Sequence, residues 1–512
     1  MPLLSLCMIV KNEEKHLTRC LASVKDVVDE IVIVDTGSND DTIRIAESYS
    51  ANIFKFDWVN DFSAARNFAL GKCNGKWILY LDADEELNKD SIVELFEKIG
   101  NKPVAVNCVV KSLTSENSKF GVMKYPRLFP NNLGIRFDGK VHEQIQSSLD
   151  KNKILLVDSN IEIIHYGYIF DENSANKKLE RNLALLLSSD IKKKNHYDLL
   201  RLAQTLHSLK RFSEAELNYK KVCNDKTVKS NLRGLAFMHF AILKYESNNI
   251  DAALDNALKA FKYIPHHAYL NFLISILYLR TSRAEKSFQY LLTAVDKNKS
   301  LIQKRSFSEN EIVSDQIDLY LRAINLSIQL NKRCELESLI NELAIFIAAF
   351  TDTNLNYIEN IIIKFITSGE LSEEEIVFLL SFVNSSNLQS FLDLMKNNQK
   401  NSLKIDVLYR LEKSFKNSAP IKKSLALLFL DSDYAKAINL FNESLEIEED
   451  PSIYFHLISI YIGIKDYDRA KANYLLLSEK FSNLTIIKPK IKVLGEKLEQ
   501  ILSLTTSEQQ AR

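Results

Sequence analysis

Two carboxylates separated by one residue follow an apolar run early in the chain. Asp82-Ala83-Asp84 comes directly after the run 77–81, Trp-Ile-Leu-Tyr-Leu, whose length and apolar character predict a buried strand. A strand that ends in this way can direct both carboxylates to one point above the sheet edge, where ligands of open α/β sheets bind. Oxygen ligands there suit Mg²⁺ or Mn²⁺ carrying a nucleotide diphosphate. The triplet alone is weak, because Asp-x-Asp also occurs by chance on surface turns.

Polar residues also follow the first two predicted strands, 4–10 and 30–35. Val10 leads into Lys-Asn-Glu, with Asn12 and Glu13 next to the strand end, and Asp35 closes the second strand. A carboxylate in such a place can accept hydrogen bonds from a base or from ribose hydroxyls. The alternative for Asp35 is a turn-forming role. For Glu13 it is the favourable charge of an acidic group at a helix N-terminus.

The segment Asp61-Phe-Ser-Ala-Ala-Arg-Asn opens a predicted helix just before the strand of the Asp triplet. Asp61 has the residue type and position of an N-cap. Arg66 lies one turn into the helix, where its planar guanidinium could reach a phosphate or a uracil carbonyl. A surface salt bridge is the alternative role for Arg66.

Two later segments add candidate groups. In 136–143, the turn signal Asp138-Gly139 precedes His142 and Glu143. Neighbouring side chains point in different directions, so at most one of these two is expected at a reacting centre. A carboxylate there could accept the proton of an attacking acceptor. His165 follows the predicted strand 161–164, where it is either a metal or diphosphate ligand or a structural histidine.

These groups sit on alternating strands and helices. Predicted helices cover 16–24, 42–50 and 62–71, and predicted strands cover 52–56 and 76–81. The strands are almost continuously apolar, which indicates a mostly parallel sheet buried on both faces. The sequence therefore predicts a Rossmann-like α/β domain over 1–170.

Beyond residue 196 the pattern changes to paired helices. Small residues recur at a spacing of 34: Ala241, Ala253 and Ala260 are matched by Ser275, Ser287 and Ala294. This spacing is typical of tetratricopeptide (TPR) repeats, in which small side chains let paired helices approach closely. We expect a helical connector over 171–195, TPR-like repeats over 196–300 and 416–500, and a degenerate helical region over 301–415.

The composition argues against a nucleic-acid-binding, a disulfide-bonded and a membrane-spanning protein. Lys plus Arg and Asp plus Glu both number 66, so the basic excess typical of nucleic-acid binding is absent. The six cysteines form no C-x-x-C pair or zinc spacing, as expected of thiols in a reducing cytosol. Neither a signal peptide nor an apolar stretch of about 20 residues is found. We therefore expect a cytoplasmic protein without a transmembrane segment.

The motifs together resemble family 2 glycosyltransferases of the GT-A fold, over residues 3 to about 185. The resemblance is carried by LCMIVKNEE, IVIVDTGSNDDT, DFSAARN, WILYLDADEE, FDGKVHE, HYGY and KLERNLAL, in that order. With its TPR tail, the chain is similar to bacterial peptide S-glycosyltransferases of the sublancin-modifying type. The resemblance implies a UDP-sugar donor, Mn²⁺ or Mg²⁺ as cofactor, and an inverting transfer of a hexose.

It also implies a role for each candidate residue. Asp35 would hold the uridine, with Val10, Asn12 and Glu13 near the base and ribose. Asp82 would touch ribose or sugar beside Ala83, and Arg66 would contact the nucleotide. Asp84 would bind the metal and His165 would complete its site. Glu143 would be the general base, with Asp138 as the second candidate.

Several functions are compatible with these motifs. The first is transfer to a protein or peptide side chain, with the TPR region binding the acceptor. The second is transfer within surface polysaccharide or lipooligosaccharide synthesis. An inactive transferase acting as a scaffold, and a nucleotidyltransferase, are two further alternatives, although no glycine-rich phosphate loop supports the latter. The sugar, the linked atom and a homodimer formed through the repeat end stay open.

Overall fold

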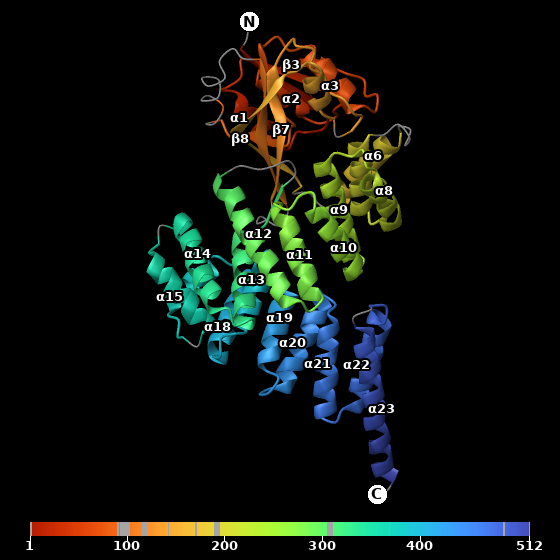
Figure 1. The fold of residues 1–512 in the computed structure, drawn as a ribbon, viewed down its shortest axis with the longest axis vertical. Helices are drawn as coiled ribbons and strands as arrows, with labels where there is room; N and C mark the ends of the chain where they lie inside the picture. Colours follow the sequence, from red (N-terminus) through yellow and green to blue (C-terminus); the bar gives the residue numbers. More distant parts are fainter. Residues whose placement is uncertain are drawn as a thin grey trace. The chain divides into compact units, whose positions relative to one another are not determined.

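The computed structural model describes residues 3–89, 92, 103–114, 120–141, 143–168, 172–188, 195–304, 311–351, 353–367, 369–484 and 487–510. The chain divides into two compact units, Met1–Leu319 and Tyr320–Arg512 (Figure 1). His142, one of the adjacent pair considered above, lies outside the described residues.

The first unit begins with a sheet in the order β3-β2-β1-β4-β7-β6-β8-β5, and β9 pairs with β7. The strands are β1 (Leu4–Val10), β2 (Glu30–Asp35), β3 (Asn52–Lys55), β4 (Trp77–Tyr80), β5 (Glu85–Leu87), β6 (Val104–Thr114), β7 (Phe120–Pro130), β8 (Leu155–Tyr168) and β9 (Glu311–Val313). Strands β1 to β4 pair in parallel, as predicted. The other half is mixed: β4 with β7, β6 with β7, and β5 with β8 are antiparallel, and β6 with β8 is parallel.

Helices cover both faces of this sheet. They are α1 (Leu17–Val24), α2 (Thr42–Ser48), α3 (Phe62–Leu70) and α5 (Gln146–Lys151). Successive side chains of β1 point to opposite faces: Leu6 packs in one buried cluster with α1, and Cys7 packs in another with α3. The α/β fold predicted from near-continuous apolar strands is confirmed. Its consequence is that the carboxyl ends of β1, β2 and β4 meet at one edge.

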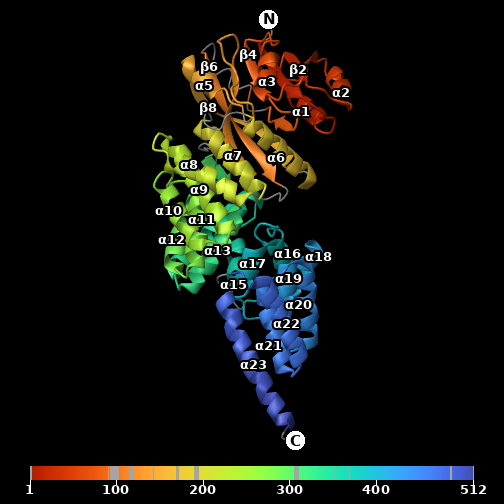
Figure 2. The same ribbon diagram turned by 90° about the vertical axis from the view of Figure 1, so that its right-hand side faces the viewer.

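Paired helices follow the sheet in the first unit (Figure 2). They are α6 (Glu172–Leu187), α7 (His196–Ser208), α8 (Phe212–Asn224), α9 (Ser230–Glu246), α10 (Ile250–Phe261), α11 (Ala268–Arg280) and α12 (Ala284–Lys304). The residues that recur every 34 positions are all buried. Ala241 and Ala253 belong to the pair α9–α10, while Ser275 and Ser287 join α11 to α12 with their Oγ atoms 3.0 Å apart. The helical-pair tail predicted from this spacing is confirmed.

The second unit is helical as well. Its elements are α13 (Gln316–Gln329), which starts just before the boundary, α14 (Arg333–Thr351), α15 (Leu355–Ile366), α16 (Glu373–Leu380), α17 (Leu388–Met395), α18 (Asn401–Ser414), α19 (Ala419–Leu428), α20 (Tyr434–Ile447), α21 (Pro451–Gly463), α22 (Tyr467–Phe481) and α23 (Lys488–Gln510). Ala437 and Phe441 of α20 are fully buried. Among the described residues, no helix combines the length and apolar character needed to cross a bilayer.

Candidate active site

A cavity of about 400 Å³ opens at the carboxyl ends of the parallel strands. Eight of the predicted site residues line it: Val10, Glu13, Arg66, Asp82, Ala83, Asp84, Glu143 and His165. They come from β1, the start of α3, the segment after β4, the loop before α5, and β8. Asn12, Asp35 and Asp138 are not among the lining residues.

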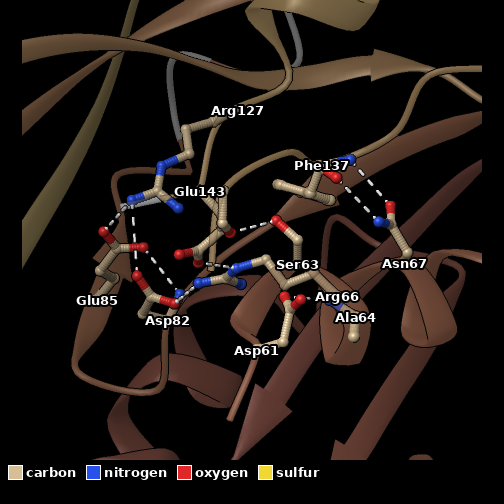
Figure 3. A network of polar contacts seen from close by, with 11 residues as sticks. Asp61, Ser63, Ala64, Arg66, Asn67, Asp82, Glu85, Arg127, Phe137 and Glu143 are labelled. Atoms are coloured by element: carbon tan, nitrogen blue, oxygen red, sulfur yellow. Dashed lines mark hydrogen bonds and ion pairs between the residues drawn. The ribbon is translucent and has the colours of Figure 1, made fainter. Parts of the chain in front are cut away.

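Arg66 is the centre of the polar network at the base of this cavity. Its Nη2 donates to Asp82 Oδ1 at 2.6 Å and its Nε donates to Glu143 Oε1 at 2.5 Å. Figure 3 shows the guanidinium between the two carboxylates. Its side chain is only 8% exposed. The ion pairs of Arg66 are therefore buried, and the alternative of a surface salt bridge is wrong. Burial raises the pKa of Asp82, but the guanidinium groups of Arg66 and Arg127 outweigh that effect and hold this pKa well below its usual range.

The start of α3 holds the loop that carries Glu143. Asp61 caps the helix by accepting a hydrogen bond from the Ala64 amide at 3.0 Å, as predicted from its residue type. Ser63 Oγ donates to the Gly139 carbonyl at 2.6 Å, and the Asn67 side chain both donates to and accepts from the Phe137 backbone at 2.9 Å (Figure 3). Ser63, Arg66 and Asn67 therefore fix this loop.

A second buried ion pair, missed by the sequence analysis, lies beside the first. Arg127 of β7 donates from Nη2 to Glu85 Oε1 at 2.6 Å, and the same nitrogen is 3.8 Å from Asp82 Oδ2. The guanidinium lies 4.4 Å from the centre of the Tyr80 ring. A charged residue within the apolar end of a strand, PRLFP, was the signal available for Arg127. Its partner could not be identified, because β7 reaches β4 only through the antiparallel half of the sheet.

Asp84 and His165 face each other on neighbouring segments. The Tyr166 amide donates to the Asp84 carbonyl at 2.9 Å, which brings Asp84 Oδ2 within 3.4 Å of His165 Nε2. His165 Nδ1 is 3.2 Å from Ser112 Oγ, so the ring is held from both sides. Burial lowers the pKa of His165, but the hydrogen bond to Asp84, together with the negative charges of Asp84, Glu85 and Asp82, outweighs that effect and raises this pKa above its usual value.

A carboxylate and an imidazole are suitable donors for a divalent cation. Within the described residues, no group of three or more His, Cys, Asp and Glu side chains could enclose one. Mg²⁺ fits such a two-residue set, because it commonly keeps several waters and takes further oxygens from substrate phosphates. The residues present therefore fit a cation that is shared with a phosphorylated ligand.

Asn12 and Asp35 lie outside the cavity lining and bond to the loop after β2. Asp35 is buried and its carboxylate accepts hydrogen bonds from the Gly37 and Ser38 amides at 3.2 and 3.0 Å, which is the turn-forming role. Asn12, at φ 56°, accepts from the Asn39 amide at 2.8 Å. Asp35 thus closes the turn after β2, and Asn12 holds that loop against the loop after β1.

Glu13 lies inside the cavity and is electrostatically coupled to its other groups. Burial, assisted by the negative charge of Asp84, raises the pKa of Glu13 to about 7, while the charge of Lys178 partly offsets the shift. Its amide donates to Thr42 Oγ1 at 2.7 Å, at the first residue of α2. A favourable charge at a helix N-terminus, the alternative considered for Glu13, does not account for its interactions with Asp84 and Lys178.

The helical segment also contributes to the cavity, which the sequence analysis did not predict. Five lining residues come from α6 and α7: Lys178, Arg181, Asn182, Tyr197 and Arg201. Three of them fall in the motif KLERN, and the spacing of Lys178, Arg181 and Asn182 within one helical turn was the available signal. The predicted connector 171–195 is thus partly a wall of the candidate site.

Comparisons with known proteins agree with this geometry. Residues 5–159 match the model of Glycosyl transferase family 2. A TPR repeat-containing protein of Synechococcus elongatus is 34% identical over 49% of this chain and 64% of its own length. The SPbeta prophage-derived glycosyltransferase SunS of Bacillus subtilis is 31% identical over 44% of this chain and 54% of its own length. The chain thus spans less than two thirds of either relative.

Solved structures with similar parts share a lower sequence identity with this chain than these two relatives do. S. aureus TarS is 17% identical at a TM-score of 0.29, over 48% of this chain and 54% of that one. A tetratricopeptide repeat protein from Parabacteroides merdae is 13% identical at a TM-score of 0.39, over 58% of this chain and 98% of its own. The family match covers β1 to β4 and most of the strands and loops that line the cavity. Residues 5–159 thus match the Glycosyl transferase family 2 model, and TPR-like helical pairs follow them.

Proposed function

We propose that this chain is an inverting, metal-assisted glycosyltransferase that moves a hexose from a UDP-sugar to a protein or peptide side chain. The observation that carries the proposal is the convergence of Asp82, Asp84 and Glu143 on one cavity of a family 2 domain. Glu143 is fixed by Arg66, and Asp84 is fixed by the β5–β8 pairing.

Glu143 is the proposed general base. Only its Oε1 bonds to Arg66 among the hydrogen bonds found in the described structure, so Oε2 is the atom proposed to accept the proton of the acceptor. The acceptor oxygen or sulfur forms a bond to the anomeric carbon as the bond to the diphosphate breaks, and the electron pair leaves with the diphosphate. Base and leaving group lie on opposite sides of that carbon, so their fixed positions favour in-line displacement. Asp138 is the second candidate, although its carboxylate is hydrogen-bonded to Ser147.

The donor is proposed to occupy the rest of the cavity. Val10, Glu13 and Ala83 would contact the nucleoside, Asp35 and Asn12 would hold the surrounding loops, and Asp82 would bind ribose or sugar. Asp84 and His165 would hold Mn²⁺ or Mg²⁺, which when bound neutralises negative charge on the diphosphate. Arg66 would act by orienting Asp82 and Glu143.

The acceptor is proposed to bind along the helical repeats, whose grooves suit extended or helical peptides. Support comes from the combination of a family 2 domain with helical pairs over 196–304 and over 419–481, the second of which lies in the segment that a truncation removes. A chain ending at residue 315 should keep nucleotide binding but lose transfer to a protein acceptor. Transfer to a lipid-linked or free oligosaccharide instead of a peptide would favour the surface-glycan alternative.

The first test is calorimetric titration of UDP into the full chain with and without Mn²⁺, beside GDP and CDP. We expect binding of UDP that weakens at least tenfold without the metal, and much weaker binding of the other two nucleotides. Asp84→Asn should reproduce the metal-free result. If none of the nucleotides binds in either condition, the transferase proposal is wrong.

A further inference from the structure

Helix α6 brings cations to the cavity that the mechanism above does not use. Lys178, Arg181 and Asn182 occupy positions i, i+3 and i+4, so they share one face of the helix, and all three line the cavity. Arg181 Nη2 donates to Asn182 Oδ1 at 3.1 Å, and its guanidinium lies 5.2 Å from the centre of the Phe62 ring. These contacts orient Arg181 from both sides.

The position of α6 is fixed against the domain that carries Glu143. Val141 is buried in the same cluster as Leu183 and Leu186 of α6, and Phe62 packs against that cluster. Lys140 Nζ also donates to Ser188 Oγ at 3.3 Å. Helix α6 therefore packs on Val141, which precedes the proposed base Glu143 by two residues, and forms one wall of the site.

The two groups of cations in the cavity differ in their surroundings. Arg66 and Arg127 are buried and bonded to carboxylates at the base of the site. Lys178 and Arg181 come from a separate helix and are exposed to solvent. Lys178 is close enough to Glu13 to lower the pKa of that carboxyl, whereas Asp84 raises it. Glu13, Asp84 and Lys178 all line the same cavity, so an anionic ligand held at Asp84 shares that cavity with Lys178.

We propose that Lys178 and Arg181 bind the diphosphate of the nucleotide-sugar donor, which makes α6 the second half of the donor site. This inference rests on the proposed function. As the bond between anomeric carbon and diphosphate oxygen breaks, the electron pair passes to the diphosphate, and cations held in place stabilise the charge that develops. A flexible lysine acts there as a point charge, while an oriented arginine can form two parallel hydrogen bonds.

The test compares a nucleoside diphosphate with its nucleoside. UDP and uridine are titrated, with Mn²⁺ present, into the full wild-type chain and into Lys178→Gln and Arg181→Gln. Each variant should bind UDP about tenfold more weakly, the value of one charge-assisted contact, and should bind uridine as the wild type does. Lys177→Gln is the matched control, because it removes a charge from the same helix at a residue outside the cavity lining. Thermal unfolding of each variant checks that the fold is kept, and Lys178→Arg should restore most of the UDP affinity.

Each outcome decides the matter. Weaker UDP binding with unchanged uridine binding in either folded variant supports the inference for that residue. UDP binding equal to the wild type in both variants overturns it, and a loss of transfer alone would then assign these cations to the acceptor. An equal loss of uridine and UDP affinity overturns it too, because the nucleoside would be the group affected. If the wild type binds neither compound, the proposed function fails first and this inference fails with it.

Discussion

At the scale of single residues, the site depends on buried charges that neutralise one another. Arg66 bonds to Asp82 and Glu143, and Arg127 bonds to Glu85, all within one cavity wall. A buried ion pair contributes little net stability, because desolvation offsets most of the attraction, but removing one partner leaves an uncompensated charge. The network is therefore best understood as a device that positions Asp82 and Glu143.

Replacing Arg66 with alanine should strongly destabilise the domain. Asp82 and Glu143 would lose the cation that they share, and we expect the free energy of unfolding to fall by about 3 kcal/mol. Arg66→Lys keeps the charge but not the planar fork that serves both partners, so an intermediate loss is expected. Urea denaturation of each variant measures this. Arg44→Ala is the control, since the pair of Arg44 with Asp41 is exposed at the surface and its loss should leave the midpoint unchanged. An unchanged midpoint for Arg66→Ala would contradict this assignment.

Glu143 and Asp138 should respond differently to loss of charge. Glu143→Gln keeps the shape of a side chain that lines the cavity but cannot accept a proton, so we expect UDP release from UDP-sugars to slow by about 10²–10⁴-fold. Asp138 is outside the cavity lining, so Asp138→Asn should lower the rate only slightly. Steady-state assays of UDP release, with UDP affinity measured in parallel, separate the two. A larger loss for Asp138→Asn would exchange the two roles.

At the scale of elements, helices α3 and α6 both contribute side chains to the cavity and hold the segment that carries Glu143. The first turn of α3 is bonded to the loop 137–143 through Ser63, Arg66 and Asn67. Helix α6 contributes Lys178 and Arg181 to the cavity while its leucines pack with Val141. The geometry of the candidate site is thus coupled to the start of the helical segment.

The repeat register makes a prediction about two buried serines. Ser275 and Ser287 occupy the positions that Ala241 and Ala253 hold one repeat earlier, and their hydroxyls are hydrogen-bonded at 3.0 Å. Ser275→Ala alone leaves the other hydroxyl without its partner and should cost about 1 kcal/mol of unfolding free energy. The double variant with Ser287→Ala reproduces the preceding repeat and should be closer to the wild type. Chemical denaturation of the three chains provides the comparison, and additive losses in the double variant would argue against it.

At the scale of the whole molecule, one half-buried histidine of α9 should make stability depend on pH. Burial lowers the pKa of His239 to about 3, and the neighbouring cations Arg201, His207 and His267 act in the same direction. Above pH 6.5 the histidine is neutral in both folded and unfolded chains. Below that value the unfolded chain binds a proton that the folded one does not, so stability falls as pH decreases towards 3.

This pH dependence can be isolated with a neutral substitution. Between pH 6.5 and 5 the contribution of His239 should lower the free energy of unfolding by about 2 kcal/mol. His239→Asn should lose less stability over the same interval than the wild type does, whatever the other titrating groups contribute to both chains. Urea denaturation at pH 7, 6 and 5 gives the difference. Parallel curves for the two chains would show that His239 is protonated in the folded state.

The amino-acid sequence alone was sufficient to predict most of the elements and eight of the residues that line the cavity. Apolar strands alternating with amphipathic helices, and small residues every 34 positions, are local patterns that reflect which face each element buries. Polar residues that follow parallel strands must meet at one edge. For that reason Asp82, Asp84 and Glu13 could be placed together before any coordinates were known.

Only the tertiary structure decided how the charges pair and which surfaces enclose them. The bonds from Arg66 to Glu143 and from Arg127 to Glu85 join residues 77 and 42 positions apart, and no local pattern encodes such a pairing. The antiparallel half of the sheet and the docking of α6 on Val141 depend on how whole elements pack. Conversely, Asp35 and Asn12 have the residue types of ligand contacts, yet their side chains are hydrogen-bonded to loop amides. A side chain's partners depend on its three-dimensional surroundings, whereas its capacity for chemistry is set by its type.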